Sequence, residues 1–462
     1  MSLATAPAAT SDERLLDRTR LPLVVGALAL VTLGALENRA VATVLPTLLG
    51  ELHAVPSFGL VSAAPLASYL IALVCAGRWS DRSGPAPTLR TGVLAFAAAQ
   101  LMVGLAPSLG VVVVGRLLSG FAEGLLDVGV IVLVARALEP RWRPSMMALF
   151  AGAWILPSVL GPVVVGAVTV TLGWRWVFLG AVVLLVPVWL ILRPALRRVA
   201  TEPASAERPL DVVPLRLVLP WAVAAAAALV VLNLAGEAAS SAPVLAGAVV
   251  VVATVTLAVS AVRLLPPGTL RAACGIGGVV ALRAAVTAAF MGIGGFLPLV
   301  LATLHHQGPA AAGISLSITG VMWSLGSTVQ SRLSARPGLV LHAGFAALVV
   351  GLAVSGLLVW TDLPVAVGLV GWAVAGLGIG MTTSTLSVLS MAVSDDATQG
   401  RNNAGAQLAS GMSGAVFFAA AGTVLALAGP GRTAFGLICG AAVVIAVLGL
   451  IGARRALCAL PA

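Results

Sequence analysis

The sequence has no lysine, a single tyrosine and few charges of either sign, since charged residues make up only 9% of its 462 positions. Soluble proteins carry about 25% charged residues, and a chain with so few could not keep its folded surface in water. Apolar residues reach 60%, against about 45–50% in soluble proteins. Lipid is itself an apolar solvent, so we predict a protein embedded in a bilayer.

Cysteine is also scarce, and its spacing excludes a metal site built from thiolates. No Cys-X-X-Cys pair occurs among the four, which are Cys75, Cys274, Cys439 and Cys458. We expect these four to be small core residues. The sequence also lacks a phosphate-binding loop, a metal motif and a nucleophile constellation. We therefore expect no metal, no cofactor and no catalytic activity.

Long apolar runs fill most of the chain, and a helix needs about 20 apolar residues to span the hydrocarbon core. Fourteen runs meet this length: 21–49, 57–77, 88–107, 109–135, 145–170, 174–193, 217–235, 242–262, 273–304, 311–331, 338–360, 364–393, 403–428 and 433–453. They do not alternate in polarity, which excludes a β-barrel. We predict an all-α integral membrane protein with about fourteen transmembrane helices.

The runs fall into groups of six, two and six. The predicted parts are an N-terminal tail (1–20), an N-terminal six-helix bundle (21–193), a linker (194–216), two additional helices (217–262), a C-terminal six-helix bundle (273–453) and a C-terminal tail (454–462). Two similar blocks are typical of transporters built from repeated halves.

Arginine gives the runs an orientation, because all 26 basic residues are Arg. With both termini cytosolic, 21 of the 26 fall in cytosolic tails and loops, two in outer loops (Arg175 and Arg432) and three within runs (Arg39, Arg116 and Arg283). Cytosolic loops are rich in Arg and Lys, so an even number of crossings is predicted. The net charge of +10 therefore indicates a multi-pass protein of the cell (inner or plasma) membrane and no nucleic-acid partner.

A charged loop follows the second run and reads Gly77-Arg-Trp-Ser-Asp81-Arg82-Ser-Gly84. The glycines permit a tight turn, Asp81 can cap the next helix or meet a neighbouring helix end, and Arg82 stays at the cytosolic surface. This segment resembles the loop signature of the major facilitator superfamily, a family of transporters. The resemblance implies contacts that hold an inner gate shut, and a plain charged turn is the alternative.

The fifth run contains Gly152, Gly161-Pro162 and Gly166. This spacing is similar to the Gly-Pro motif of the antiporter branch of the same family. Glycines there allow close helix packing, and the proline is expected to bend the helix. The resemblance implies the major facilitator fold, with two six-helix bundles and two extra central helices as in fourteen-helix drug:proton antiporters.

Six charged residues lie within the runs, namely Glu37, Arg39, Arg116, Glu123, Asp127 and Arg283. Each would cost about 2.5–3.5 kcal/mol at a helix centre, so they should face a cavity or one another. Arg116, Glu123 and Asp127 share one face of the fourth run by helical spacing. We predict a cluster at the bilayer midplane, built mainly from the first and fourth runs.

A carboxyl group in such a cluster is either neutral or charged and paired with an arginine. Desolvation raises the pKa of a carboxyl and a nearby arginine lowers it, so a conformational change can bind or release a proton. Glu37, where fourteen-helix exporters of the family also have an acidic residue, and Glu123 are the first candidates for proton coupling. Asp127 is the third, with Arg116 and Arg39 as partners. Static ion pairs are the alternative.

Candidates for the substrate cleft are the polar and aromatic residues Asn38, Trp154, Arg283, Trp323 and Gln407. Arg283 would balance a carboxylate across the cleft or bind an anionic substrate, or its side chain would extend to the cytosolic interface. Gln407 would bind substrate or join two helices.

The resemblance and the buried charges together predict a proton-coupled exporter of small lipophilic compounds, of the multidrug efflux type, that works by alternating access. Its partners would be a small-molecule substrate, protons and the lipid bilayer, and it would be a monomer. One alternative is an exporter or importer of one specific metabolite, siderophore or lipid. Another is a non-transporting receptor or scaffold.

Overall fold

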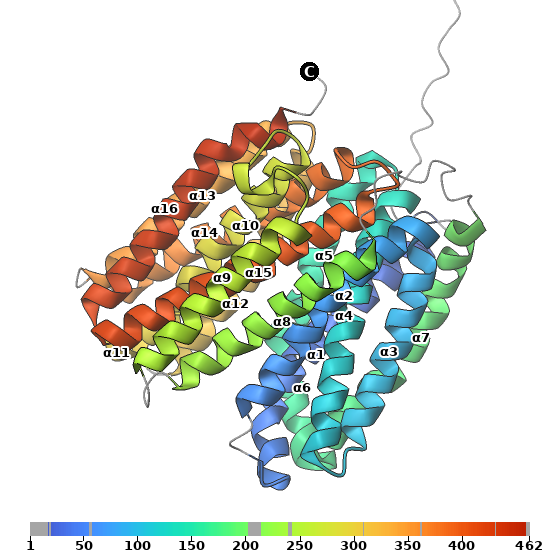
Figure 1. The fold of residues 1–462 in the computed structure, drawn as a ribbon, viewed down its shortest axis with the longest axis horizontal. Helices are drawn as coiled ribbons and strands as arrows, with labels where there is room; N and C mark the ends of the chain where they lie inside the picture. The colour runs from blue at the N-terminus through green and yellow to red at the C-terminus, as the bar shows by residue number, and fades with distance from the viewer. Residues whose placement is uncertain are drawn as a thin grey trace, which may run out of the picture.

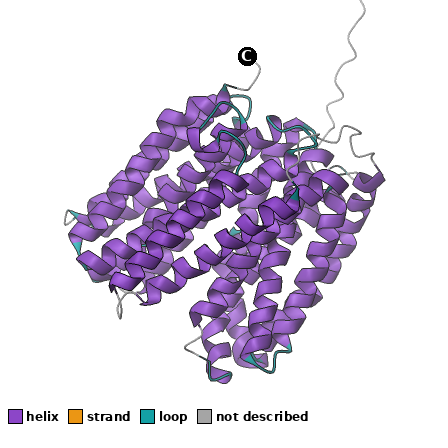
Figure 2. Cartoon of the chain, viewed as in Figure 1, coloured by secondary structure: helices purple, strands orange, loops and turns teal. Residues whose placement is uncertain are grey.

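The computed structural model describes residues 17, 20–54, 58–201, 214–238, 243–307, 309–360, 363–429 and 431–458. This part of the chain is helical and contains no strand (Figure 2), which confirms the all-α prediction. Most of the predicted N-terminal tail, residues 202–213 of the predicted linker and residues 459–462 of the predicted C-terminal tail lie outside the described residues.

The helices follow one another with short connections. The first group is α1 (Leu21–Glu51), α2 (Phe58–Ser83), α3 (Pro85–Gly104), α4 (Leu109–Ala137), η2 (Pro140–Trp142), α5 (Arg143–Ala153), α6 (Ile155–Leu172) and α7 (Arg175–Thr201). Next come α8 (Leu215–Ala238), α9 (Pro243–Leu264) and η3 (Thr269–Arg271). The last group is α10 (Ile276–Gly294), α11 (Leu297–Thr303), α12 (Pro309–Arg332), α13 (Pro337–Gly356), η4 (Leu357–Val359), α14 (Val365–Ala392), α15 (Gln399–Ala428) and α16 (Arg432–Leu457).

Twelve stretches of the described chain are long and apolar enough to cross a membrane. They match twelve of the predicted runs, with α10 and α11 together making one of them. The remaining two runs, 145–170 and 311–331, are occupied by α5 with α6 and by α12. The protein is therefore multi-pass, and the predicted number of fourteen crossings is approximate.

Two of the predicted runs contain a helix break. One separates α5, which ends at Ala153, from α6, and the other separates α10, which ends at Gly294, from α11. Four residues after each helix end stands a proline, Pro157 or Pro298, which has no N–H to donate to that last helical carbonyl. The first interruption thus precedes Pro162, where the sequence predicted a bend, and α6 continues through that residue.

The helices form two groups with a helix pair lying across them (Figure 1). Helices α1–α7 gather on one side and α10–α16 on the other. The two sides meet where α2 packs against α15 and where α5 packs against α12, while α8 and α9 pack on each other and on α2 and α15. The predicted domain boundaries stay a prediction.

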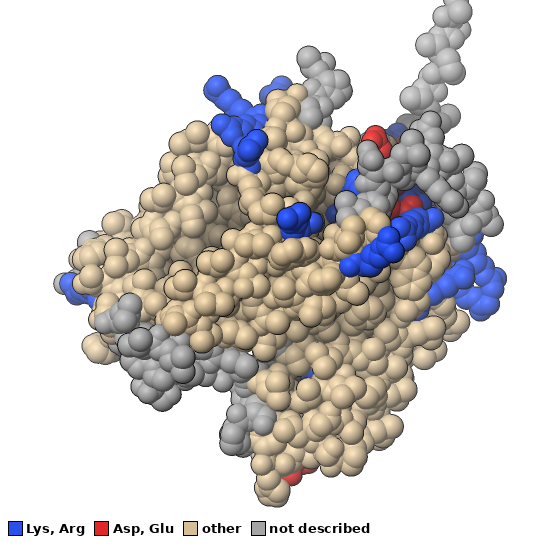
Figure 3. Space-filling model, in the orientation of Figure 1, with Lys and Arg blue, Asp and Glu red and all other residues tan. Residues whose placement is uncertain are grey.

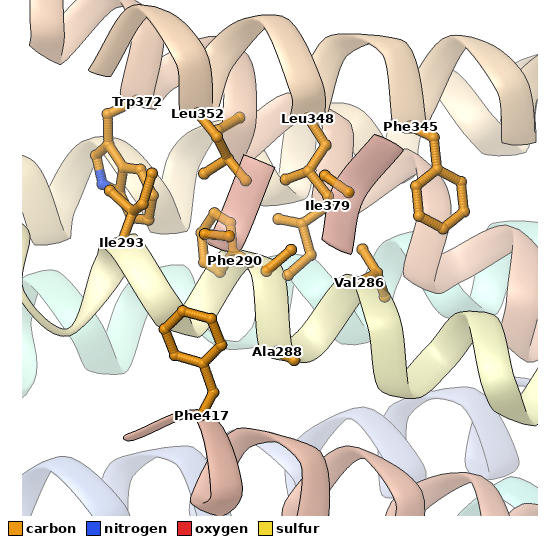
Figure 4. Close-up of a cluster of buried hydrophobic side chains, with 14 of the residues drawn as sticks. Val286, Ala288, Phe290, Ile293, Phe345, Leu348, Leu352, Trp372, Ile379 and Phe417 are labelled. Carbon is orange, nitrogen blue, oxygen red and sulfur yellow. The ribbon is translucent and has the colours of Figure 1, made fainter. Parts of the chain in front are cut away.

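Close contact between helices depends on small residues, because lipid provides no hydrophobic force that drives helices together. A Cβ atom on Gly120 of α4 would overlap the carbonyl of Pro65 on α2, and one on Gly380 of α14 would overlap the carbonyl of Trp323 on α12. Larger side chains fill the space between α10, α13 and α14 (Figure 4). There Phe290 stacks on Trp372, with ring centroids 4.5 Å apart.

Two cysteines differ from the expectation that all four are core residues. Cys274 and Cys458 are exposed and form a disulfide bond, with Cα atoms 5.8 Å apart. The bond joins the segment before α10 to the end of α16, across a sequence separation of 184 residues. The fold therefore pairs residues whose spacing in the sequence gives no sign of it. Cys75 and Cys439 are free and partly buried.

Candidate functional site

A buried ion pair joins α1 to α4. Glu37 Oε1 accepts a hydrogen bond from Arg116 Nη1 at 2.7 Å, a second from Ser119 Oγ at 3.1 Å and a third from Gln100 Nε2 at 3.4 Å. Glu37 is only 7% exposed and Arg116 only 8%. Each charge needs its partner at such depth, because an unpaired buried charge costs several kcal/mol. The structure thus brings together the two charged residues that the sequence placed on different helices.

The other two acidic residues of α4 lie further along the same helix. Asp127 Oδ2 accepts a hydrogen bond from the hydroxyl of Tyr69 on α2 at 2.7 Å. Glu123 is partly buried one turn before Asp127, within electrostatic range of Asp127, Glu37 and Arg116. Three carboxyl groups and one guanidinium therefore form one connected group, here called the carboxylate cluster.

Arg283 of α10 lies in the second half of the molecule and is held by two other helices. Its Nη1 donates to Ser387 Oγ on α14 at 2.7 Å and to the carbonyl of Thr383 at 3.2 Å. Its Nη2 donates to Gln407 Oε1 on α15 at 3.2 Å. Arg283 also interacts electrostatically with Asp127 of the first half. Its guanidinium is therefore fixed in the interior, facing the carboxylate cluster, and does not extend to the membrane interface.

The remaining cleft candidates have different surroundings. Asn38 is exposed on α1, and the side chain of Arg39 lies outside the described residues. Trp154 stands at the α5–α6 break and is 39% exposed. Trp323 is partly buried and packs edge-to-face on Phe290 at 5.7 Å, so part of its ring belongs to the core of the second half.

The sequence predicts a loop at residues 77–84, but α2 continues through Ser83 and only Gly84 lies between α2 and α3. The signature segment at the end of α2 contacts the second half of the molecule. The Asp81 carboxylate accepts from the backbone N–H groups of Gly400 at 2.6 Å and Arg401 at 2.9 Å. Both amides lie in the first turn of α15, whose free N–H groups and positive end of the helix dipole favour an acceptor with negative charge. Arg82 is exposed, and Gly84 has φ +76°, a value that L side chains rarely adopt. We call this contact between α2 and α15 the α2–α15 latch.

Close backbone approach makes the latch possible. A Cβ atom on Gly77 would lie 2.8 Å from the carbonyl oxygen of Gly400. Arg136, at the end of α4, adds to the same contact, since its Nη2 donates to the carbonyls of Ser80 at 3.3 Å and Asp396 at 3.0 Å. The sequence gave the glycines and Asp81 a gating role by resemblance, but it did not distinguish Arg136 from the other loop arginines.

The Gly-Pro motif lies on α5 and α6. A Cβ atom on Gly152 would lie 3.6 Å from Ser324 Oγ of α12, at the second contact between the halves. Gly161 is buried, a Cβ atom on Gly166 would meet nothing within 4 Å, and the side chain of Pro162 lies outside the described residues. Gly152 is therefore the member of the motif with a described position between the halves.

Several residues in these contacts were missed by sequence reasoning. Tyr69, Gln100, Ser119 and Ser387 bind the predicted charges, yet each is an ordinary polar residue within an apolar run. The available signal was that Tyr69 is the sole tyrosine of the chain. Within the described residues, no group of three His, Cys, Asp or Glu side chains is placed to hold a metal ion.

Comparison with known proteins gives a consistent family. Residues 27–417 match the family model of the Major Facilitator Superfamily. A protein named probable multidrug-efflux transporter from Mycobacterium tuberculosis (strain ATCC 25618 / H37Rv) is 28% identical over 421 residues, which are 87% of each chain. Multidrug resistance protein 3 of Bacillus subtilis (strain 168) is 25% identical over 156 residues, which are 34% of this chain and 30% of that protein.

The fungal phomenoic acid biosynthesis cluster MFS-type transporter of Leptosphaeria maculans is 28% identical over a stretch that covers 37% of this chain and 28% of its own length. The chain thus spans less than a third of this relative and of the B. subtilis protein.

Solved structures share the fold at low sequence identity. The human organic anion transporter MFSD10 aligns with a TM-score of 0.70 and 15% identity over 94% of this chain and 99% of that one. A bacterial homologue of the iron transporter ferroportin, in an outward-facing state, aligns with a TM-score of 0.68 and 14% identity over 95% and 99%. The family match covers most of the helices described above, so this chain is a multi-pass membrane protein that belongs to the Major Facilitator Superfamily.

Proposed function

We propose that this protein is a proton-coupled exporter of small lipophilic compounds, of the multidrug efflux type. The carboxylate cluster is the observation that carries the proposal. Glu37 is paired with Arg116 in this conformation, and any movement between α1 and α4 that separates them leaves a buried carboxylate without its partner. Taking up a proton removes that charge, and re-forming the pair releases it. The relatives named multidrug-efflux transporter and multidrug resistance protein support the substrate class.

Alternating access supplies the movement. The α2–α15 latch holds the two halves together at the end of the molecule that we place in the cytosol with both termini. Opening this end requires Asp81 to leave the amides of Gly400 and Arg401. Proton exchange at the cluster and opening at the latch would then be linked through α2 and α4, which pack together along their length. We further propose that the protein lies in the cell (inner or plasma) membrane and works as a monomer.

The test is transport by purified protein in liposomes with an imposed pH gradient. In the Glu37→Gln and Glu123→Gln variants we expect substrate movement that no longer depends on the gradient. Glu139→Gln is the matched control, because Glu139 makes an ion pair with Arg20 at 2.7 Å but is 48% exposed. Gradient-driven transport that persists unchanged in both variants would remove these residues from the coupling mechanism.

A second candidate function is transport of one metabolite with an anionic group. Arg283 favours it, because its guanidinium is held in the interior by Ser387 and Gln407 and faces the first half. A panel of compounds assayed in the same liposomes, with and without a protonophore, separates the two functions. Movement of many unrelated lipophilic compounds supports multidrug efflux, and movement of one anionic compound that is lost in Arg283→Gln supports the second candidate.

A further inference from the structure

A long apolar groove lies between α9, α10, α15 and α16, away from the carboxylate cluster. Its volume is about 820 Å³. Along α15 its lining extends from Ala409 to Val424, which is about 22 Å at 1.5 Å per helical residue. The hydrocarbon core of a bilayer is about 30 Å thick, so the groove follows most of that depth.

The walls of the groove offer a ligand almost no polar contact. Three polar residues line it, Thr254, Thr269 and Ser413. Ser413 Oγ donates to the carbonyl of Ala284 at 2.9 Å and Thr269 Oγ1 to that of Pro266 at 2.7 Å, so both hydroxyl protons are already used. Small alanine side chains leave the groove open, and Ala288 of α10 is one of them. Phe417 of α15 also lines the groove and points toward α10 (Figure 4). The part of a ligand that lies against these walls must therefore be hydrocarbon.

One end of the groove is basic. Thr269 and Leu270 of η3 line it there, and the next residue, Arg271, is exposed. Arg455, at the end of α16, donates from Nη1 to the carbonyl of Arg271 at 3.0 Å, and its neighbour Arg454 is exposed. Figure 3 shows basic side chains at this end of the molecule, above a surface hollowed between α9 and α16.

Little negative charge is available to balance these arginines. From residue 273 to the C-terminus the sequence has only three acidic residues, Asp362, Asp395 and Asp396. Guanidinium groups bind phosphate oxygens in a bidentate manner, and basic pockets between transmembrane helices recognise anionic lipid head groups. The groove thus combines a hydrocarbon slot with a phosphate-binding mouth.

We propose that this groove is a binding site for an anionic diacyl phospholipid. One acyl chain lies along α15 and α16, and the phosphate lies at Arg271, Arg454 and Arg455. The mouth is at the same end as the α2–α15 latch, where α15 begins and α16 ends. None of the residues that line the groove belongs to the carboxylate cluster, and the existence of the site does not depend on proton coupling.

The experiment is native mass spectrometry of the purified protein with added phosphatidylglycerol or phosphatidylcholine of identical acyl chains. We expect the wild-type protein to retain phosphatidylglycerol in preference to phosphatidylcholine. In Arg271→Gln with Arg454→Gln, retention of phosphatidylglycerol should fall about 25-fold, about fivefold per arginine. The surface variant Arg90→Gln on α3, also exposed, is the matched control and should retain the lipid as the wild type does.

The groove itself is tested by filling it. Ala441→Trp on α16 and Ala420→Phe on α15 place a ring in the slot from two walls, and both should abolish retention of either lipid. Val350→Trp, at a position on α13 that is 55% exposed, adds the same bulk outside the groove and should change nothing. Thermal unfolding in detergent confirms that each variant is folded, and two groove variants are made so that one folded variant suffices.

Three results would overturn the proposal. Equal retention of the two lipids by the wild-type protein would exclude selection by charge. Retention of phosphatidylglycerol that persists in a folded groove variant would place the lipid elsewhere. Loss of bound phosphatidylglycerol on addition of sodium phosphate alone would show a site for a free anion without an acyl chain.

Discussion

Replacing Asp81 by asparagine should open the α2–α15 latch. The carboxylate accepts from the amides of Gly400 and Arg401 at 2.6 and 2.9 Å, and asparagine can accept only one of these bonds and carries no charge. Hydrogen bonds to charged groups contribute about 1.5–3 kcal/mol each, so the loss of one should favour the open state by that amount. The open population should then rise about 10- to 150-fold.

Alkylation of a buried cysteine measures that population. Ser80 on α2 is fully buried and packs against Gly400, so Ser80→Cys reacts with a maleimide only when α2 and α15 separate. Cys75 and Cys439 are replaced by alanine, and the disulfide-bonded pair is kept. Because opening precedes reaction, the labelling rate should rise in proportion to the open population, at least tenfold in Asp81→Asn.

The control is Asp395→Asn, which makes the same chemical change at an exposed residue between α14 and α15. It should leave the labelling rate of Cys at position 80 within a factor of two of the parent protein. A rate in Asp81→Asn that also stays within a factor of two would show that the latch does not hold the halves together. An equal rise in both variants would assign the effect to surface charge.

Three further outcomes follow from the contacts. Gly77→Ala should also raise the labelling rate, because its Cβ would lie 2.8 Å from the Gly400 oxygen. Gly180→Ala is the control, since its Cβ would meet nothing within 4 Å, and it should leave the rate unchanged. Equal rates in the two variants would contradict the close approach of α2 and α15. Glu37→Ala should lower the free energy of unfolding in detergent by about 3–5 kcal/mol because Arg116 is left unpaired, and adding Arg116→Met should recover most of it; a loss that the second change does not reduce would argue against the pair. Arg283→Lys should lower the transport rate more than the free energy of unfolding, because an ammonium group cannot reproduce the planar arrangement of the three hydrogen bonds that the guanidinium makes. Unchanged transport kinetics would assign Arg283 a purely structural role.

The positions of the apolar runs are the part of the fold that sequence reasoning reached. Each run is long because a helix must satisfy its own backbone across the hydrocarbon core, and this requirement is local. The breaks after α5 and α10 each stand four residues before a proline, Pro157 or Pro298. A proline alone does not decide a break, because α2 and α8 continue through Pro65 and Pro220. The resemblance to the Gly-Pro motif placed the predicted bend at Pro162. The observed break lies earlier, between α5 and α6, before Pro157.

The candidate site was predicted as a list of charges and not as contacts. Helical spacing placed Arg116, Glu123 and Asp127 on one face of α4, and Arg116 and Arg39 were predicted as partners of the carboxyl groups, but the sequence did not tell which carboxyl group pairs with which arginine. Partners come from other helices: Glu37 from α1 for Arg116, and Tyr69 from α2 for Asp127. Neutral polar residues of this kind are too common in membrane helices to be recognised from one sequence.

The sequence by itself determined that the protein spans a membrane many times, because burying an apolar chain of this composition needs lipid and each crossing needs about 20 apolar residues. It also determined which charges had to be shielded. Only the tertiary structure decided how they are shielded, which cysteines pair, and that Asp81 caps the first turn of α15 across 320 residues of sequence. The physical reason is one of range: membrane insertion depends on the composition of each segment, whereas hydrogen bonds act over about 3 Å and depend on which helices lie side by side.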